Sequence, residues 1–137
     1  QDQNLRTLAD LDRFIRQLLR SVIDHFFYFQ NVGHFMSDPT LKQSELTNSD
    51  IVRENFMQQL VNLIADGYFN AEFTPALART LGNFIMLSHY SWAQYTLLHE
   101  RDSDAAIDAF ARDHFAILAP YFTQKGLLEY RELYGEM

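Results

Sequence analysis

The sequence predicts an all-α protein, a helical bundle of five or six helices, and three observations support this class. Apolar residues recur at spacings of three and four along most of the chain, which is the period of an amphipathic helix. Proline follows a capping residue at Asp38-Pro39 and at Thr74-Pro75, a typical signal for the start of a helix. No stretch of convincing length shows the strict alternation of a half-buried strand.

Length and composition restrict the possible classes of protein. The 137 residues, 47% of them apolar and 21% charged, suit one globular domain over residues 1–137. The net charge of −7 argues against DNA binding by these residues, because proteins that bind phosphates normally carry a basic surface. No apolar run is long enough to span a bilayer, so we expect no membrane contact. The absence of cysteine excludes disulfides and thiolate metal sites and favours the cytoplasm.

The first helix is expected to begin after Thr7, because Thr7-Leu8-Ala9-Asp10 resembles a capping box. Its apolar face consists of Leu11, Phe14, Ile15, Leu18, Val22, Phe26 and Phe29. The opposite face is rich in arginine and aspartate and should be solvated. Phe27 and Tyr28 then fall on that polar face, so we expect the chain to turn inward there, with Gly33 permitting the bend.

The second long segment is expected to begin at Pro39 with Asp38 as its N-cap. The polar run Thr47-Asn48-Ser49-Asp50 is either a break or a point where the helix is capped again. Beyond it, half of the helix circumference is apolar, through Val52, Phe56, Met57, Leu60, Val61, Leu63, Ile64 and Tyr68. Asp66-Gly67 is expected to end the helix.

The next helix, from Pro75 to about Glu100, is apolar on most sides, which predicts that it is buried on most sides. In a chain of this size, a helix is difficult to bury on most sides without a second subunit. Ser103 is expected to cap an alanine-rich helix that Pro120 either ends or kinks, and Thr123 is expected to cap a last helix.

The motifs of common enzyme and metal sites are absent from the sequence. No His follows a Glu by three residues, and there is no His-Glu-x-x-His, P-loop or Gly-x-Ser-x-Gly motif. We therefore predict no catalytic residue, no metal and no cofactor, and a protein that is not an enzyme. The run Ser88-His89-Tyr90-Ser91-Trp92, with Tyr95, mixes polar groups and aromatic rings, as pockets for small organic ligands do. The alternative is core residues with satisfied polar tips.

Two segments resemble the regulatory domain of TetR-type bacterial transcriptional regulators. The first contains Phe27-Tyr28 and then Asp38-Pro39-Thr40-Leu41, which is similar to the family's aromatic stretch followed by Asp-Pro-x-Leu. The second, Pro120-Tyr121-Phe122-Thr123 with Gly126, is similar to the family's Pro-Tyr-Leu-Thr-x-x-Gly ending, with Phe122 in place of Leu. The similarity extends from about Leu5 to Leu133. It implies an effector-binding and dimerisation domain whose N-terminal helix-turn-helix domain is missing from these residues, an expectation that fits the acidic charge.

The resemblance implies a repressor whose operator binding responds to a small hydrophobic or aromatic effector. The family's cavity lies between the first long helix, the central helix and the inner face of the helix from Pro75 to Glu100. Carried over, the expected lining is Leu18, Val22, Phe26, Phe29, Phe35, Phe56, Leu60, Phe84, Ser88, Trp92 and Tyr95. DNA would be contacted only through the missing N-terminal domain.

The resemblance also implies a homodimer in which the last two long helices of each subunit form a four-helix interface. The residues expected there are Leu81, Ile85, Tyr90, Ala109, Phe110, Ile117 and Tyr121. Two other readings remain open. One is a protein-interaction module with an exposed aromatic groove for a partner helix. The other is a small helical enzyme with titratable residues around His89 or His25.

Overall fold

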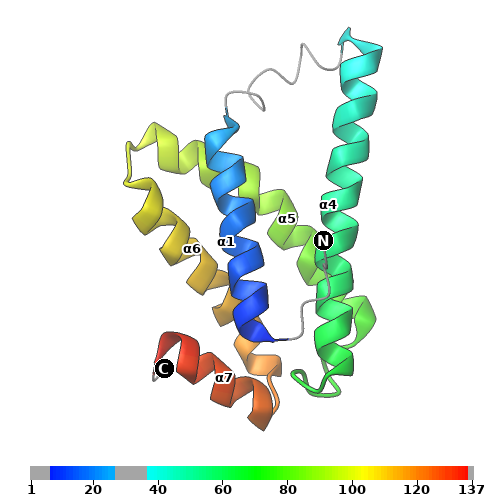
Figure 1. Cartoon of the computed structure of the whole chain (residues 1–137), viewed down its shortest axis with the longest axis vertical. Helices are drawn as coiled ribbons and strands as arrows, with labels where there is room; N and C mark the ends of the chain where they lie inside the picture. The colour runs from blue at the N-terminus through cyan, green and yellow to red at the C-terminus, as the bar shows by residue number, and fades with distance from the viewer. Residues whose placement is uncertain (1–6, 27–36, 136–137) are drawn as a thin grey trace.

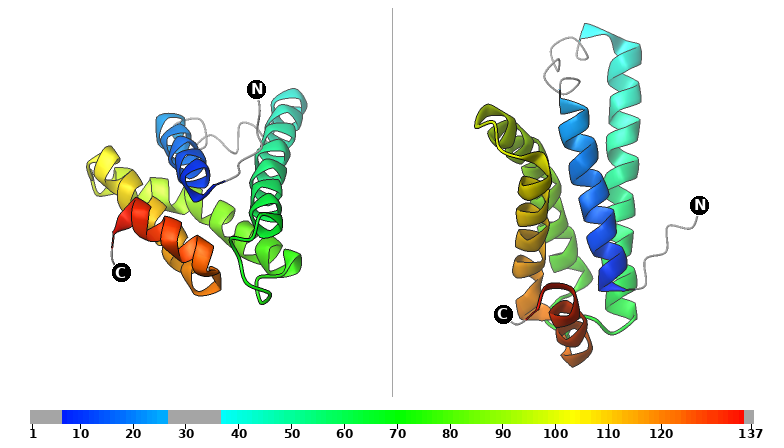
Figure 2. Two further views of the ribbon diagram at one scale, coloured as in Figure 1. Left: turned by 60° about the horizontal axis from the view of Figure 1, so that its bottom comes forward. Right: turned by 60° about the vertical axis from the view of Figure 1, so that its left-hand side comes forward.

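The computed structural model describes residues 7–26 and 37–135, and over these residues the chain is a bundle of five α-helices. Helices α1 (Leu8–Asp24) and α4 (Pro39–Ala65) run antiparallel, and α5 (Pro75–Leu98) passes behind α1 and packs on both (Figure 1). Helix α6 (Ser103–Leu118) lies on the other side of α1, and the 3₁₀ turn η1 (Ala119–Tyr121) leads into α7 (Gln124–Tyr134) at the base (Figure 2). The all-α prediction is confirmed.

The predicted helix starts are correct at four of the five helices. Thr7, Asp38, Thr74 and Thr123 each accept a hydrogen bond from a backbone N–H of the first turn. The prediction for α6 is wrong by one residue. Asp102 is the N-cap, with its carboxylate accepting from the Ala105 N–H at 2.9 Å, and Ser103 is already the first helical residue.

Helix α4 continues without a break through Thr47-Asn48-Ser49-Asp50, which decides between the two expectations for that run. Its polar side chains find partners on the same helix. The Thr47 hydroxyl donates to the Gln43 carbonyl at 3.0 Å, and Asp50 pairs with Arg53 at 2.7 Å. The helix ends at Asp66-Gly67 as predicted, and Gly67 adopts a φ of 85° that glycine tolerates best.

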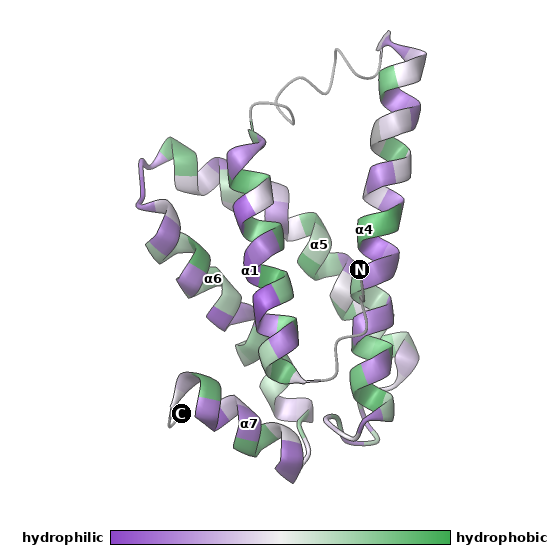
Figure 3. Ribbon diagram, viewed as in Figure 1, coloured by the Kyte–Doolittle hydropathy of each residue, from purple (hydrophilic) through white to green (hydrophobic). Residues whose placement is uncertain are grey.

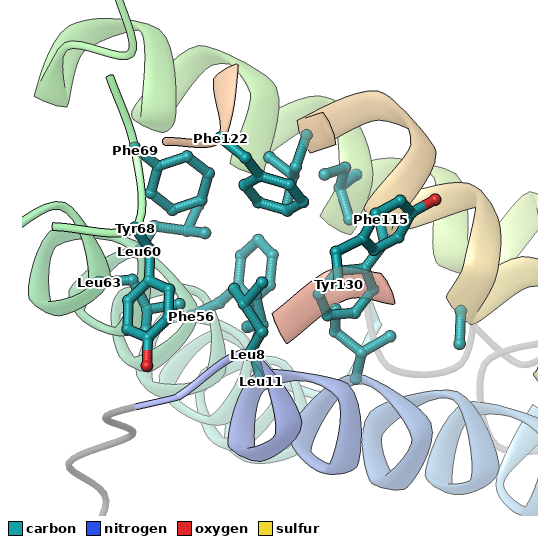
Figure 4. Packing of buried hydrophobic residues seen from close by; sticks show 14 of the residues in the cluster. Leu8, Leu11, Phe56, Leu60, Leu63, Tyr68, Phe69, Phe115, Phe122 and Tyr130 are labelled. Carbon is teal, nitrogen blue, oxygen red and sulfur yellow. The ribbon is translucent and has the colours of Figure 1, made fainter. Parts of the chain in front are cut away.

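The hydrophobic core lies in the lower half of the bundle, where α1, α4, α5, α6 and α7 meet (Figure 4). Its largest fully buried side chains include Phe56, Phe73 and Phe115. Phe56 stacks on Phe14 of α1, with ring centroids 6.2 Å apart. Hydrophobic residues recur between hydrophilic ones along α1, in agreement with its predicted amphipathic pattern (Figure 3).

Side chains on the polar face of α1 contact α6 and α7, although the sequence predicts that this face is solvated. Arg16 pairs with Asp12 on its own helix and reaches Asp108 of α6 at 2.8 Å. Arg20 pairs with Asp104 at the start of α6, and the Tyr134 hydroxyl donates to Asp12. These contacts fix the positions of α6 and α7 on α1, although exposed ion pairs add little to the free energy of folding.

Glu129 joins three separate segments at the base of the bundle. Its carboxylate accepts from the Ala9 N–H in the first turn of α1 and from the Tyr68 hydroxyl, both at 3.0 Å. A carboxylate at a helix N-terminus also interacts favourably with the helix dipole. Burial, together with the nearby Glu129 carboxylate, raises the pKa of Tyr68 to about 12, so its hydroxyl remains a donor at neutral pH.

Gly126 lets α7 approach the backbone at Tyr68. A Cβ at this position would lie 2.6 Å from the Tyr68 carbonyl oxygen and 3.0 Å from the Phe122 Cβ. In an open helix, changing glycine to alanine stabilises by roughly 1 kcal/mol. Here we expect the opposite. Gly126→Ala should lower the free energy of unfolding by about 1–3 kcal/mol, because the added Cβ would force the backbone at Tyr68 to move. Urea unfolding checks this, and Gln124→Ala, an exposed change in the same turn, should change it little.

Candidate functional site

A cleft of about 520 Å³ opens above the core, between the end of α1, the first half of α4 and the middle of α5. Its lining is Leu18, Ser21, Val22, His25, Leu41, Ser44, Asn48, Ser49, Val52, Met86, His89 and Tyr90. None of these twelve is Lys, Arg, Asp or Glu, so the cleft combines apolar walls with neutral hydrogen-bonding groups. This is the usual composition of a site for a small organic molecule.

The sequence of α4 explains why space remains here. In its second half, large apolar side chains such as Phe56 and Leu60 fill the interior. In its first half, the side chains that face α1 and α5 are shorter or polar, among them Ser44, Asn48 and Ser49. The aromatic pair Phe26 and Tyr90 lies beside the cleft, with ring centroids 5.3 Å apart.

His89 lines the cleft from α5 and is hydrogen-bonded to a second buried histidine on α6. His89 Nε2 lies 3.0 Å from His114 Nε2, and the two residues are only 4% and 1% exposed. His114 Nδ1 lies 2.7 Å from the Phe110 carbonyl oxygen. The histidine pair, His89 with His114, therefore connects the cleft to the interior of the α5–α6 contact.

Aromatic rings surround the histidine pair. Phe110 meets His114 edge-on, with ring centroids 4.6 Å apart, and stacks on Trp92 at 5.1 Å. Burial lowers the pKa of His89 to about 3, with a further contribution from His114, and burial also lowers the pKa of His114. The backbone contact with Phe110 and the charge of Asp113 oppose the shift at His114. Both rings are consequently neutral at pH 7.

A second depression, on the polar side of α1, does not form a comparable site. It is wide and shallow, and its border contains Arg13, Arg16 and Arg20. Each of these arginines is already paired with an aspartate of α1 or α6. The positive charges are therefore neutralised locally, and they offer no free anion-binding group.

The structure brings only some of the expected ligand residues to the cleft. Leu18 and Val22 line it, and Phe26 is buried beside it against Tyr90. Phe29 and Phe35 lie outside the described residues, as does the expected inward turn near Gly33.

Phe56 and Leu60 are placed differently from the expectation. Both side chains have no exposed surface and belong to the core below the cleft. The apolar face of α4 is continuous in sequence, but only its first half faces the cleft.

The four expected residues on α5 lie away from the cleft lining. Ser88 is half-buried and its hydroxyl donates to the Ile85 carbonyl at 2.6 Å, while Trp92 packs on Phe110. Phe84 and Tyr95 are on the outer side of α5, where Phe84 is 70% exposed. Their direction is set by the helix period, which carries them to the side opposite the buried His89.

The residues expected at a dimer interface are also divided between two environments. Ala109 and Ile117 are exposed on α6, and Leu81, Phe110 and Tyr121 are half-buried. Ile85 is buried in the core, whereas Tyr90 lines the cleft and stacks on Phe26 but remains partly exposed. The large exposed side chains of α5 are Phe84, Leu87, Tyr90, Tyr95, Leu97 and Leu98.

Sequence analysis missed several groups at this site. The sequence indicates no binding role for His114 or Ser44, and Asn48 and Ser49 belong only to the polar run Thr47-Asn48-Ser49-Asp50. The separation of 25 residues between His89 and His114 is no known motif, so the pairing needs the packing of α5 on α6 to appear. The one available signal was a histidine on the otherwise apolar inner face of a helix.

Two kinds of function find no support among the described residues. No group of three or more His, Cys, Asp or Glu side chains is placed to hold a metal ion within residues 7–26 and 37–135. Over the same part of the chain, each helix is either too short or too polar to cross a membrane.

Comparison with known proteins gives one family. The family model TetR, described as bacterial transcriptional repressor, matches residues 1–130. No curated protein and no solved structure shows significant similarity to the chain.

Proposed function

Because this chain belongs to the TetR family of bacterial transcriptional repressors, we propose that it is the effector-binding and dimerisation domain of such a repressor. The observation that carries the proposal is the cleft between α1, α4 and α5, where none of the described lining residues is Lys, Arg, Asp or Glu. The effector is a small, uncharged and mostly apolar molecule. DNA is contacted by an N-terminal helix-turn-helix domain, as the family resemblance implies.

The exposed apolar residues of α5 support a homodimer. Phe84, Leu87, Ser91, Tyr95 and Leu98, here called the outer stripe, fall within a narrow arc of the helix opposite the buried side. Leu87 and Leu98 are 77% and 75% exposed in the single chain. An exposed stripe of this kind, apolar except for Ser91, typically marks a protein interface. The exposed alanines of α6, Ala109 and Ala116, would allow a second helix pair to approach closely.

Helix α5 connects the two proposed sites. Met86 and His89 face the cleft, while the outer stripe lies on the other side of the same helix. A ligand that shifts or rotates α5 would therefore also change the geometry of the dimer, and with it the spacing of two DNA-binding domains. Such coupling requires that the ligand bind the two dimer arrangements with different affinity.

We expect Leu87→Glu to convert the dimer into a monomer at micromolar concentration. A carboxylate in the centre of an apolar interface would lose its hydration without gaining a partner. Sedimentation equilibrium of the wild-type chain and the variant measures this directly. The matched control is Leu128→Glu, an exposed leucine on α7 that is not part of the outer stripe.

The control variant should remain a dimer with an unchanged circular dichroism spectrum. A wild-type chain that sediments as a monomer would contradict the homodimer. The outer stripe would then suit the second candidate function, a docking face for a helix of another protein.

A further inference from the structure

The contact with Phe110 determines which nitrogen of His114 carries a proton. A carbonyl oxygen can only accept, so the 2.7 Å contact requires that Nδ1 of His114 be the donor. A neutral imidazole carries one proton, which leaves Nε2 of His114 as an acceptor. Neutrality follows from the position of the ring, which is 1% exposed and packed edge-on against Phe110.

The protonation of His114 in turn determines that of His89. The two Nε2 atoms are 3.0 Å apart, and one of them must donate. Because Nε2 of His114 is the acceptor, Nε2 of His89 carries the proton. Nδ1 of His89 is then a bare acceptor, and among the described residues it has no hydrogen-bond partner.

Nδ1 is consequently the polar atom that His89 can offer to the cleft. The other polar groups of the lining are serine hydroxyls, an asparagine amide, the Tyr90 hydroxyl and the more exposed His25. Hydroxyls and amides both donate and accept, so they adapt to either kind of ligand group. His89 is different, since its Nε2–H bond to His114 prevents the ring from presenting a donor.

We infer that the cleft selects an uncharged ligand with an apolar body and a hydrogen-bond donor, a hydroxyl or an N–H, which His89 Nδ1 accepts. The inference rests on the proposed ligand-binding function and specifies its ligand class. A ligand that carries only acceptors, such as an ether or an ester, cannot donate a hydrogen bond to Nδ1 of His89. A carboxylate would meet a lone pair there, and no Lys or Arg is among the lining residues that the structure describes.

A matched pair of small molecules tests the inference. The probes are 1-naphthol and 1-methoxynaphthalene, which share an aromatic body and differ in whether the oxygen can donate. We expect the wild-type chain to bind 1-naphthol about tenfold more tightly by isothermal titration calorimetry, the factor that one satisfied buried hydrogen bond gives. His89→Phe retains a ring and should abolish the preference. His99→Phe, a change of an exposed histidine outside the cleft, should retain it.

The protonation state can be measured without any ligand or variant. Long-range ¹H–¹⁵N correlation spectra of the wild-type chain distinguish the two neutral forms of each histidine. We expect His114 protonated on Nδ1 and His89 on Nε2. A spectrum with His89 protonated on Nδ1 would overturn the inference, whatever the stability of the variants.

The binding outcomes separate this inference from the proposed function. Equal affinity for the two probes in the wild-type chain would refute the requirement for a donor and leave the cleft as a ligand site. Tighter binding of the ether would refute it as well. Binding of neither probe would count against the cleft as a ligand site, and therefore against both proposals.

Discussion

Replacing Phe56 with alanine is expected to lower the free energy of unfolding by about 3–5 kcal/mol, the range typical of a buried phenylalanine. The side chain has no exposed surface and stacks on Phe14 of α1. A Cβ placed on Gly82 would lie only 3.4 Å from the Phe56 ring, so α5 also packs closely against it. The truncated side chain would leave a cavity at the point where α1, α4 and α5 meet. Urea unfolding of both proteins at one fixed concentration measures the loss, because dimerisation makes apparent stability depend on concentration.

Phe84→Ala is the matched control for Phe56→Ala. The family resemblance implies the same role in ligand binding for both residues, but Phe84 is 70% exposed on α5. Its replacement should cost less than about 1 kcal/mol in the folding of the single chain, while weakening the proposed dimer. If Phe56→Ala left stability unchanged and abolished binding of a cleft ligand, the assignment of Phe56 to the core would be wrong.

Acidification below pH 6.5 is expected to destabilise the chain through the histidine pair. Burial depresses the pKa of His89 from 6.5 to about 3, so the unfolded state binds a proton more readily than the folded state between these values. Stability is therefore complete above pH 6.5 and declines as pH falls toward 3. The depressed pKa of His89 alone should lower the free energy of unfolding by up to about 1.4 kcal/mol per pH unit, or by about 2–3 kcal/mol at pH 4.5. His114, whose pKa is also lowered, adds to the loss.

Urea unfolding at pH 7, 6, 5 and 4.5 would measure this dependence. The double variant His89→Phe with His114→Phe should show a shallower decline, whatever its stability at pH 7. His99→Phe is the control, because His99 is exposed at the end of α5 in the folded chain as in the unfolded one. An equal slope in the wild-type chain and the double variant would show that other groups, such as the paired Asp108, dominate the acid response.

The helix starts could be predicted from the sequence because their causes are local. Thr7, Asp38, Thr74 and Thr123 each act on backbone groups within three residues, and in two cases proline follows. The error at Ser103 is also local, because it displaces the N-cap by one residue. Two adjacent residues can both cap a helix, and only the conformation of the chain before α6 selects Asp102.

The positions of the site residues depend on contacts that no local pattern contains. The helix period shows that Phe56, Phe84 and His89 belong to apolar faces, but not whether a face meets the core, a cleft or solvent. Helix α5 has an apolar residue on nearly every side, so its direction in the bundle is set by α1, α4 and α6. The pairing of His89 with His114 likewise exists only once α5 lies on α6.

The unequal packing along α4 has a consequence for local opening of the backbone. Between Thr40 and Glu54 nearly every described side chain is at least partly exposed, whereas the second half of the helix is anchored by Phe56, Leu60 and Leu63. Amide hydrogens in the first half should therefore exchange with solvent through local fraying, and those in the second half only through global unfolding. A molecule held in the cleft would contact Leu41, Asn48 and Val52 and slow exchange in the first half alone. The protection pattern along a single helix would thus report occupancy of the cleft residue by residue.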